Sequence, residues 1–219
     1  MVTDKAGNAV TYTVTVSNAV PKPPVDMPEC NQDASCVLSR FTDVDPTESY
    51  HDGLHYCVAY GMISGMSDTT VGPNVVANRA MLVTMLYRME GKPSIEGMSE
   101  PFTDVQPGDW YYEAVVWAYN EKVVNGTSAT TYDPGRNITR EQVATILHRY
   151  CGMPEGTGDL SRFPDEASVS AYAKDAMVWA VGEGLINGVI TSQGTMLEPA
   201  GNATRAQIAI IVMRYYTEG

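Results

Sequence analysis

One pattern of landmark residues occurs three times along the chain, and this internal repeat constrains the fold more than any other feature. Each copy opens on a Phe with an Asp two residues later, and a Gly closes an apolar run 24 or 25 residues after the Phe. A Pro follows, an Arg stands six residues after it, and a second Arg comes nine residues later. The landmarks are Phe41, Phe102 and Phe163; Asp43, Asp104 and Asp165; Gly65, Gly126 and Gly188; Pro73, Pro134 and Pro199; Arg79, Arg140 and Arg205; and Arg88, Arg149 and Arg214. Landmarks kept in register at this spacing indicate tandem copies of one supersecondary unit.

Each copy is predicted to form a helix, a loop and a second helix. In copy two, Asp109 is the predicted N-cap of the first helix, and the Asn-Gly at 125–126 is its predicted end. The second helix starts with Thr-Arg-Glu-Gln at 139–142, a capping box that 204–207 repeats in copy three. Its apolar residues recur at helical spacing, as Val143, Ile146, Leu147 and Tyr150.

A unit of this size would be only marginally stable alone, because a small domain buries too little of its surface. We therefore expect the three copies, at 36–95, 96–156 and 157–219, to bury one another's apolar stripes and to fold as one body. The predicted fold class is all-α, with three tandem helix-loop-helix repeats and a short N-terminal β segment.

The N-terminus has a different pattern. Val10, Tyr12, Val14 and Val16 alternate with threonines, which is typical of a half-buried strand, and the preceding turn predicts a hairpin within 1–20. This segment resembles the end of a bacterial immunoglobulin-like domain. Residues 21–35 are rich in proline and are predicted to be an extended linker. Residues 1–25 do not have the pattern of a signal peptide, so we expect the chain to be a fragment of a longer protein with covalently linked upstream domains.

Composition excludes several classes of partner. The formal net charge is −12, whereas nucleic acid and anionic membranes require a basic face. The sequence contains no run of eighteen apolar residues, the length needed to span a bilayer, so membrane insertion is not expected. An anionic ligand would have to be bound by local hydrogen-bond donors, because the negative electrostatic potential of the whole chain opposes its binding.

With these residues in place, the pattern resembles the S-layer homology repeat over about 36–219. The resemblance rests on the Phe-x-Asp-Val openings, the Trp-Tyr pair at 110–111, the Asn-Gly, the Pro and the Thr-Arg-Glu-Gln start. It implies a pseudo-threefold arrangement whose inter-repeat grooves bind secondary cell-wall polysaccharide, often acidic and carrying a pyruvyl ketal on N-acetylmannosamine. It further implies a secreted, non-enzymatic anchor on a Gram-positive-type envelope. We expect a monomer without a cofactor.

The copies depart from this pattern in places. Ser49 stands where copy two has Trp110, and copy three has Tyr172 there. Copy one also lacks the capping box at 78–81, so its groove matches the pattern least. A degenerate module of the same fold, with a structural or protein-interaction role, is therefore one alternative function. A wall-glycan hydrolase is a weaker one, because the acidic residues lie at predicted caps and loops.

The arginines are the main candidate site residues. Arg79, Arg140 and Arg205 fall in the first turn of a helix, where a cation is unfavourable by about 0.3–1 kcal/mol. One explanation is an anion site, made of helix-start amides and the guanidinium, for a ligand carboxylate. The other is an internal ion pair with Asp43, Asp104 or Asp165, which would then hold the arginine in place. On the first explanation, Arg140→Ala should lower binding with little loss of fold.

Two aromatic positions complete the candidate site. Trp110 stands at a helix start, where it could stack on a sugar face or serve as a partly exposed packing residue. Tyr172 is its counterpart in copy three. Trp117 and Trp179 lie at helical core positions and are predicted to be buried.

Other candidate chemistry is not favoured. His51 and His55 have the i, i+4 spacing of a zinc pair, with Cys57 nearby, but a third ligand is not apparent, so no metal site is predicted. Cys30 and Cys36 could form a local disulfide in an exported protein, and a Cys36–Cys57 pair is also open. Cys151 follows the second helix of copy two.

Overall fold

The computed structural model describes residues 2–3, 9–10 and 26–217. Within 26–217 it is mainly helical, as predicted, with two helices in each repeat. Repeat 1 contains α1 (His51–Ala59) and α2 (Arg79–Met89); repeat 2 contains α3 (Tyr112–Asn120) and α4 (Arg140–Tyr150). Repeat 3 contains the short 3₁₀ turns η1 (Glu166–Ser168) and η2 (Ala171–Ala173), then α5 (Lys174–Gly182) and α6 (Arg205–Thr217).

The four β-strands of the described residues form two small hairpins. β1 (Val2–Thr3) pairs antiparallel with β2 (Ala9–Val10), which is the predicted N-terminal β segment. The remainder of the predicted hairpin and most of the linker, at 11–25, lie outside the described residues, and the immunoglobulin-like domain stays a prediction. In repeat 3, β3 (Val189–Thr191) pairs with β4 (Gly194–Met196) and lengthens the loop before α6. None of the helices in 26–217 is long and apolar enough to cross a membrane.

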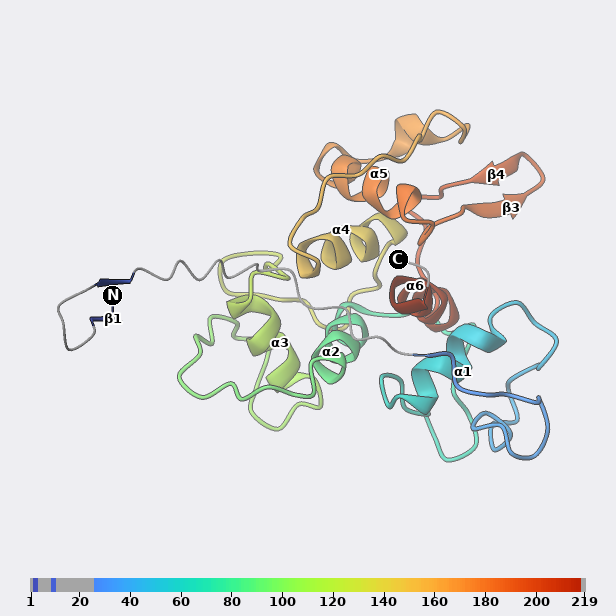
Figure 1. The fold of residues 1–219 in the computed structure, drawn as a ribbon, viewed down its shortest axis with the longest axis horizontal. Helices are drawn as coiled ribbons and strands as arrows, with labels where there is room; N and C mark the ends of the chain where they lie inside the picture. The colour runs from blue at the N-terminus through green and yellow to red at the C-terminus, as the bar shows by residue number, and fades with distance from the viewer. Residues whose placement is uncertain (1, 4–8, 11–25, 218–219) are drawn as a thin grey trace.

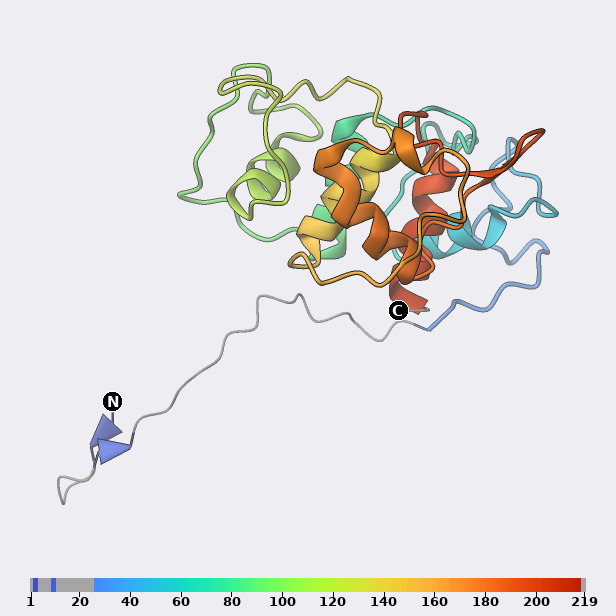
Figure 2. The ribbon, with the colours of Figure 1, turned by 90° about the horizontal axis from the view of Figure 1, so that it is seen from above.

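The two helices of one repeat do not form the main packing pair. Instead, α3 packs on α2, α5 packs on α4, and α1 closes the ring by packing on α6. Figure 1 shows α2, α4 and α6 gathered in the middle with α1, α3 and α5 outside them, and Figure 2 shows the same body from above. Each repeat therefore buries its apolar stripe against its neighbours, and one continuous core runs through all three.

Backbone hydrogen bonds at the centre have the same threefold order. The N–H of Ile138 donates to the Ala77 carbonyl, Ala203 donates to Ile138, and Ala77 donates to Ala203, at 2.9–3.0 Å. Ile138 is fully buried at this point. The closed cycle of three bonds, one from each repeat to the next, gives the pseudo-threefold arrangement a backbone basis.

The helix ends confirm some predictions and correct others. The Thr139–Gln142 capping box is present, Thr204 and Gln207 form another, and Asn78 caps α2 alone. The predicted N-cap Asp109 is wrong, because α3 starts three residues later and Asp109 instead accepts from the Gln106 N–H.

The predicted end of the first helix at 125–126 is also wrong. α3 stops at Asn120, and Lys122 turns the chain with a φ of 62°. The Val123 N–H then bonds back to the Ala118 carbonyl, as in a Schellman-type end. Gly126 instead makes room for an aromatic ring, because a Cβ there would lie 2.5 Å from Cε1 of Phe102. The glycine of each copy is therefore explained by the phenylalanine, whose ring lies where a side chain would be.

Candidate functional site

The Asp landmark of each copy holds the loop that precedes the second helix. The two carboxylate oxygens of Asp104 accept from the N–H groups of Tyr132 and Asp133, at 2.8 and 2.7 Å. Asp43 does the same for Val71 and Gly72, and Asp165 for Leu197 and Glu198, at 2.7–2.9 Å. The three predicted site aspartates are therefore bound to backbone amides of their own repeat.

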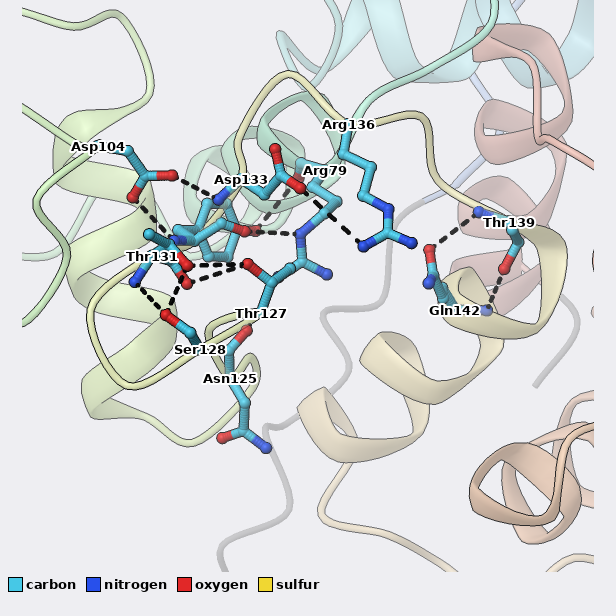
Figure 3. A network of polar contacts seen from close by, with 11 residues as sticks. Arg79, Asp104, Asn125, Thr127, Ser128, Thr131, Asp133, Arg136, Thr139 and Gln142 are labelled. Carbon is cyan, nitrogen blue, oxygen red and sulfur yellow. Dashed lines mark hydrogen bonds and ion pairs between the residues drawn. The ribbon is translucent and has the colours of Figure 1, made fainter.

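A first-turn arginine from another repeat holds the same loop from its carbonyl side. Nε of Arg79 donates to the Tyr132 carbonyl at 3.0 Å, and its guanidinium lies 4.4 Å from the centre of the Tyr132 ring. Nε of Arg140 donates to Leu197 at 2.8 Å, and Nε of Arg205 donates to Val71 at 2.9 Å. Figure 3 shows Asp104 and Arg79 both directed at the loop before α4.

This arrangement rules out the predicted ion pairs. Asp and Arg bind the N–H and the C=O of one and the same loop residue, so peptide groups lie between them. Within 26–217, none of the three first-turn arginines comes within 4.0 Å of a carboxylate oxygen. Burial lowers the pKa of the Arg140 guanidinium, and the nearby Glu198 and Asp165 carboxylates oppose this shift.

The first two backbone N–H groups of α2, α4 and α6 are also bonded and so are not free for a ligand. The predicted anion site made of helix-start amides and the guanidinium is therefore wrong in its amide part. The N–H groups of Arg79 and Ala80 donate to the carbonyls of Arg136 and Pro134 in repeat 2. The corresponding amides of α4 bond to Gly201 and Pro199, and those of α6 bond to Val75 and Pro73. Nη2 of Arg79 donates to the Asn125 carbonyl at 2.9 Å, and Nη2 of Arg205 donates to the Ser64 carbonyl at 2.8 Å. The other N–H groups of the terminal nitrogens are the donors that these two arginines can still offer to a ligand.

Arg205 borders an open groove at the loop of repeat 1, which we name groove A. Its volume is about 410 Å³, and Arg205 of repeat 3 faces Arg88 of repeat 1 across it. Burial and then the positive charge of Arg88 lower the pKa of Arg205, although Asp43 opposes the shift. Among the described residues, no carboxylate lines this groove to balance the two cations. The wall is completed by Met62, Ile63, Ser64, Gly65, Met66, Met81, Thr84 and Trp110.

An equivalent groove of about 170 Å³, groove B, lies one repeat further on. Arg79 of groove B corresponds to Arg205 of groove A, Arg149 corresponds to Arg88, and Tyr172 corresponds to Trp110. The correspondence shows that each groove is built by three successive repeats around the ring. Asn125, Gly126, Gln142 and Thr145 occupy the places of Ser64, Gly65, Met81 and Thr84.

The two predicted aromatic residues lie exposed at the groove rims. Trp110 is 60% exposed and Tyr172 57% exposed. The Tyr172 hydroxyl donates to Oε1 of Glu141 at 2.9 Å, and the same buried carboxylate accepts from the N–H and hydroxyl of Ser170. Tyr172 is thus fixed in place, whereas Trp110 rests edge-on against the Tyr111 ring. Trp117 and Trp179 are buried, as predicted.

The third position around the ring departs from the other two. The aligned residues are Arg140 and Arg214, with Ser49 in the aromatic position. Nη1 of Arg214 donates to the Leu185 carbonyl, as Nη1 of Arg88 does to Met62. Ser49 therefore leaves the third position, at the loop of repeat 3, without the aromatic residue that grooves A and B have at their rims. Groove A, at the loop of repeat 1, is the larger of grooves A and B.

Sequence reasoning missed the second arginine of each copy. A cation in the last turn of a helix is favourable, so Arg88, Arg149 and Arg214 needed no further explanation. Their position nine residues after the first arginine in every copy was the available signal. The guanidinium of Arg149 makes no hydrogen bond or ion pair with the described residues, and it lines groove B.

The cysteine and histidine candidates lie together beside α1. None of the four cysteines forms a disulfide in the described part of the chain. Cys57 donates to the Ala209 carbonyl in α6 and is buried there, and the aligned residues Ala118 and Ala180 of the other repeats are also small and buried. Cys30 and Cys36, from the segment that precedes the Phe41 landmark, come together with His55, so a third ligand that sequence reasoning did not find is present.

A closed ring of three helical repeats around one shared core places the chain in the class of helical-repeat modules. The S-layer homology domain matches the chain three times, at 40–80, 101–144 and 162–209. The chain belongs to the S-layer homology family. Modules of this family anchor secreted proteins to the cell wall, and the predicted localisation is confirmed on that basis.

Known relatives contain this module within much longer chains. The sequence is 32% identical over 165 residues to an amylopullulanase of Thermoanaerobacterium thermosulfurigenes, covering 74% of this chain and 9% of the relative. It is 31% identical over 180 residues to the surface-layer 125 kDa protein of Lysinibacillus sphaericus, covering 80% of this chain and 15% of the relative. An exoglucanase XynX of Acetivibrio thermocellus is 32% identical over 166 residues, covering 74% and 15%.

Proposed function

We propose that this module anchors its parent protein by binding an acidic secondary cell-wall polysaccharide, with a ligand carboxylate such as a pyruvyl ketal placed between the arginines of grooves A and B. The observation that carries the proposal is the pair of guanidinium groups in each groove, with no carboxylate among the described residues that line it. Such a pair repels itself, and a bound carboxylate removes the repulsion while accepting charge-assisted hydrogen bonds.

The rim aromatics support a sugar rather than a simple anion. The exposed face of Trp110 offers an apolar surface next to Arg88 and Arg205, which suits a pyranose ring whose carboxylate reaches inward. A second hollow of about 270 Å³ continues past Arg88 and Trp110. It provides space for a neighbouring residue of a polymer beside groove A.

The first-turn arginines and the aspartates have different parts in this proposal. Arg79 and Arg205 position a loop through Nε and offer their remaining N–H groups to the ligand. Asp43, Asp104 and Asp165 act through the loop, by fixing the backbone that borders the groove. Arg140 is only 5% exposed and links repeats 2 and 3, so we now expect Arg140→Ala to weaken the fold as well as any binding.

Arg149→Ala gives the sharpest test in groove B, because the Arg149 side chain makes no bond that the fold needs. Trp110→Ala tests groove A. Arg136→Ala and Met153→Ala are matched controls, since both side chains are exposed and lie outside the grooves. Binding is measured by co-sedimentation with purified walls, before and after chemical removal of the polysaccharide, and by calorimetric titration with a pyruvylated N-acetylmannosamine.

We expect a loss of about tenfold or more for each groove's own ligand, consistent with one charge-assisted contact or stacking contact. The controls should bind like the parent chain. Equal binding to stripped walls, or unchanged binding by the Arg149→Ala and Trp110→Ala double variant, would contradict the proposal and favour a structural module of the same fold. Release of soluble sugars from walls would instead indicate hydrolysis.

A further inference from the structure

Four potential metal ligands meet where the segment that precedes the Phe41 landmark crosses α1. One ligand atom each from Cys30, Cys36 and His55 lies within 4.8 Å of the others. Nε2 of His51, one helical turn before His55, is 3.7 Å from Sγ of Cys36. The two imidazole rings are stacked with their centroids 5.9 Å apart, so both face the same side of the helix. Two thiols and two imidazoles are a ligand set that Zn²⁺ prefers.

His55 is buried without the hydrogen bonds that usually accompany burial. The residue is 2% exposed, and its Nδ1 has no hydrogen-bond partner in the described part of the chain. A buried polar atom left unpaired is unfavourable, because it loses its hydrogen bonds to water without replacing them. Val116 and Val178 occupy the aligned position in the other repeats, so the fold itself does not require an imidazole there.

The surroundings of His51 favour a ligand role. Its Nδ1 lies 3.2 Å from a carboxylate oxygen of Asp52, which is the second contact that metal-binding histidines commonly make. A proton on Nδ1 leaves the lone pair on Nε2 directed toward Cys36. The pocket lined by Cys36 and His51 has a volume of about 360 Å³ and gives a path for an ion from solvent.

We propose that Cys30, Cys36, His51 and His55 bind one Zn²⁺ ion in a tetrahedral structural site. Zn–S and Zn–N bonds of about 2.3 and 2.0 Å place neighbouring ligand atoms roughly 3.5 Å apart. The 3.7 Å between Sγ of Cys36 and Nε2 of His51 is close to this value, and the ligand atoms of Cys30, Cys36 and His55, which lie within 4.8 Å of one another, would move closer together around the ion. Both thiols lose a proton on binding, and two thiolates neutralise the ion in a buried setting. A Cys30–Cys36 disulfide, the competing outcome, would leave both imidazoles without a ligand role.

The site would fasten the segment that precedes the Phe41 landmark to α1. The same segment is already held at Asp26, whose carbonyl accepts from the Tyr60 hydroxyl at 2.7 Å. Because α1 is the helix that closes the ring on α6, metal binding should stabilise the closure of the whole module. The inference is independent of the proposed glycan function, since no groove residue takes part.

The test begins with the 219-residue chain purified under reducing, metal-free conditions and then given Zn²⁺. After dialysis, elemental analysis should find one zinc per chain, and Co²⁺ in its place should give the absorption of a tetrahedral thiolate complex. Zn²⁺ should also raise the melting temperature. Cys30→Ser and His55→Ala should abolish all three signals, and Cys30→Ser, on a half-buried residue, is expected to keep the fold.

Cys151→Ser and His148→Ala are the matched controls and should retain the metal. Two results would overturn the proposal. One is a failure of the reduced chain to take up zinc, with a Cys30–Cys36 cross-link found by mass spectrometry of the oxidised chain. The other is a zinc content that Cys30→Ser and His55→Ala leave unchanged.

Discussion

At the scale of single residues, the Phe and Gly landmarks of each copy form one contact. The Phe102 ring lies where a side chain at Gly126 would be, and the carbonyl oxygens of Ser128 and Thr131 crowd the same point. We expect Gly126→Ala to destabilise the module by about 1–3 kcal/mol, because backbone and ring would both have to move. Gly135→Ala is the control, since a Cβ there meets no atom within 4 Å. Urea denaturation compares the two, and equal midpoints would contradict this interpretation of the glycine.

At the scale of elements, the loop before each second helix depends on its aspartate. Asp104→Ala removes the acceptor of the Tyr132 and Asp133 amides, and hydrogen bonds to a charged group are each worth about 1.5–3 kcal/mol. We expect a loss of about 2–3 kcal/mol in the free energy of unfolding. Hydrogen exchange at the Tyr132 and Asp133 amides should become fast. Asp68→Ala, which removes an exposed carboxylate from a loop of repeat 1, should change neither; protection that persists in Asp104→Ala would show that the loop is held by other means.

The elements themselves were largely predictable, but their partners were not. Helical periodicity marked the buried faces of α3 and α4, and the capping box at Thr139 marked a helix start to the residue. A stripe shows which face is buried and not what covers it, so the packing of α3 on the preceding α2 could not be derived. The same limit applies to the arginines, because their acceptors are backbone carbonyls, which every residue type provides.

The Cys–His cluster was missed for a related reason. His51 and His55 share a helix and were visible as a pair, but Cys30 and Cys36 lie in a segment without regular periodicity. Only the course of that segment over α1 brings the thiols to the imidazoles. Cys57, the nearer cysteine in sequence, faces α6 and the interior of the ring.

At the scale of the whole molecule, the contact between α1 and α6 decides whether three repeats behave as one. Gly53 makes this contact tight: a Cβ there would lie 2.8 Å from the Ile210 nitrogen and 2.9 Å from its Cα. The aligned residues at the other two helix pairs are Ala114 and Ala176, which already carry a methyl group, so the closing interface is the tightest of the three.

Helix propensity alone would make Gly53→Ala stabilising by about 1 kcal/mol. We expect the opposite sign, with a loss of about 1–3 kcal/mol, because the clash is with helix backbone that cannot yield alone. Trp117 and Trp179 lie in α3 and α5, which take no part in the contact between α1 and α6, so their fluorescence reports helices that the substitution does not touch. If the ring is one cooperative unit, its fluorescence and circular dichroism midpoints should fall together.

Ala114→Gly, at the aligned site, is the control and should lose stability because glycine has the lower helix propensity. A stabilised Gly53→Ala would show that the ring does not close as tightly as described, and a fluorescence midpoint that stays in place would show that the repeats unfold separately.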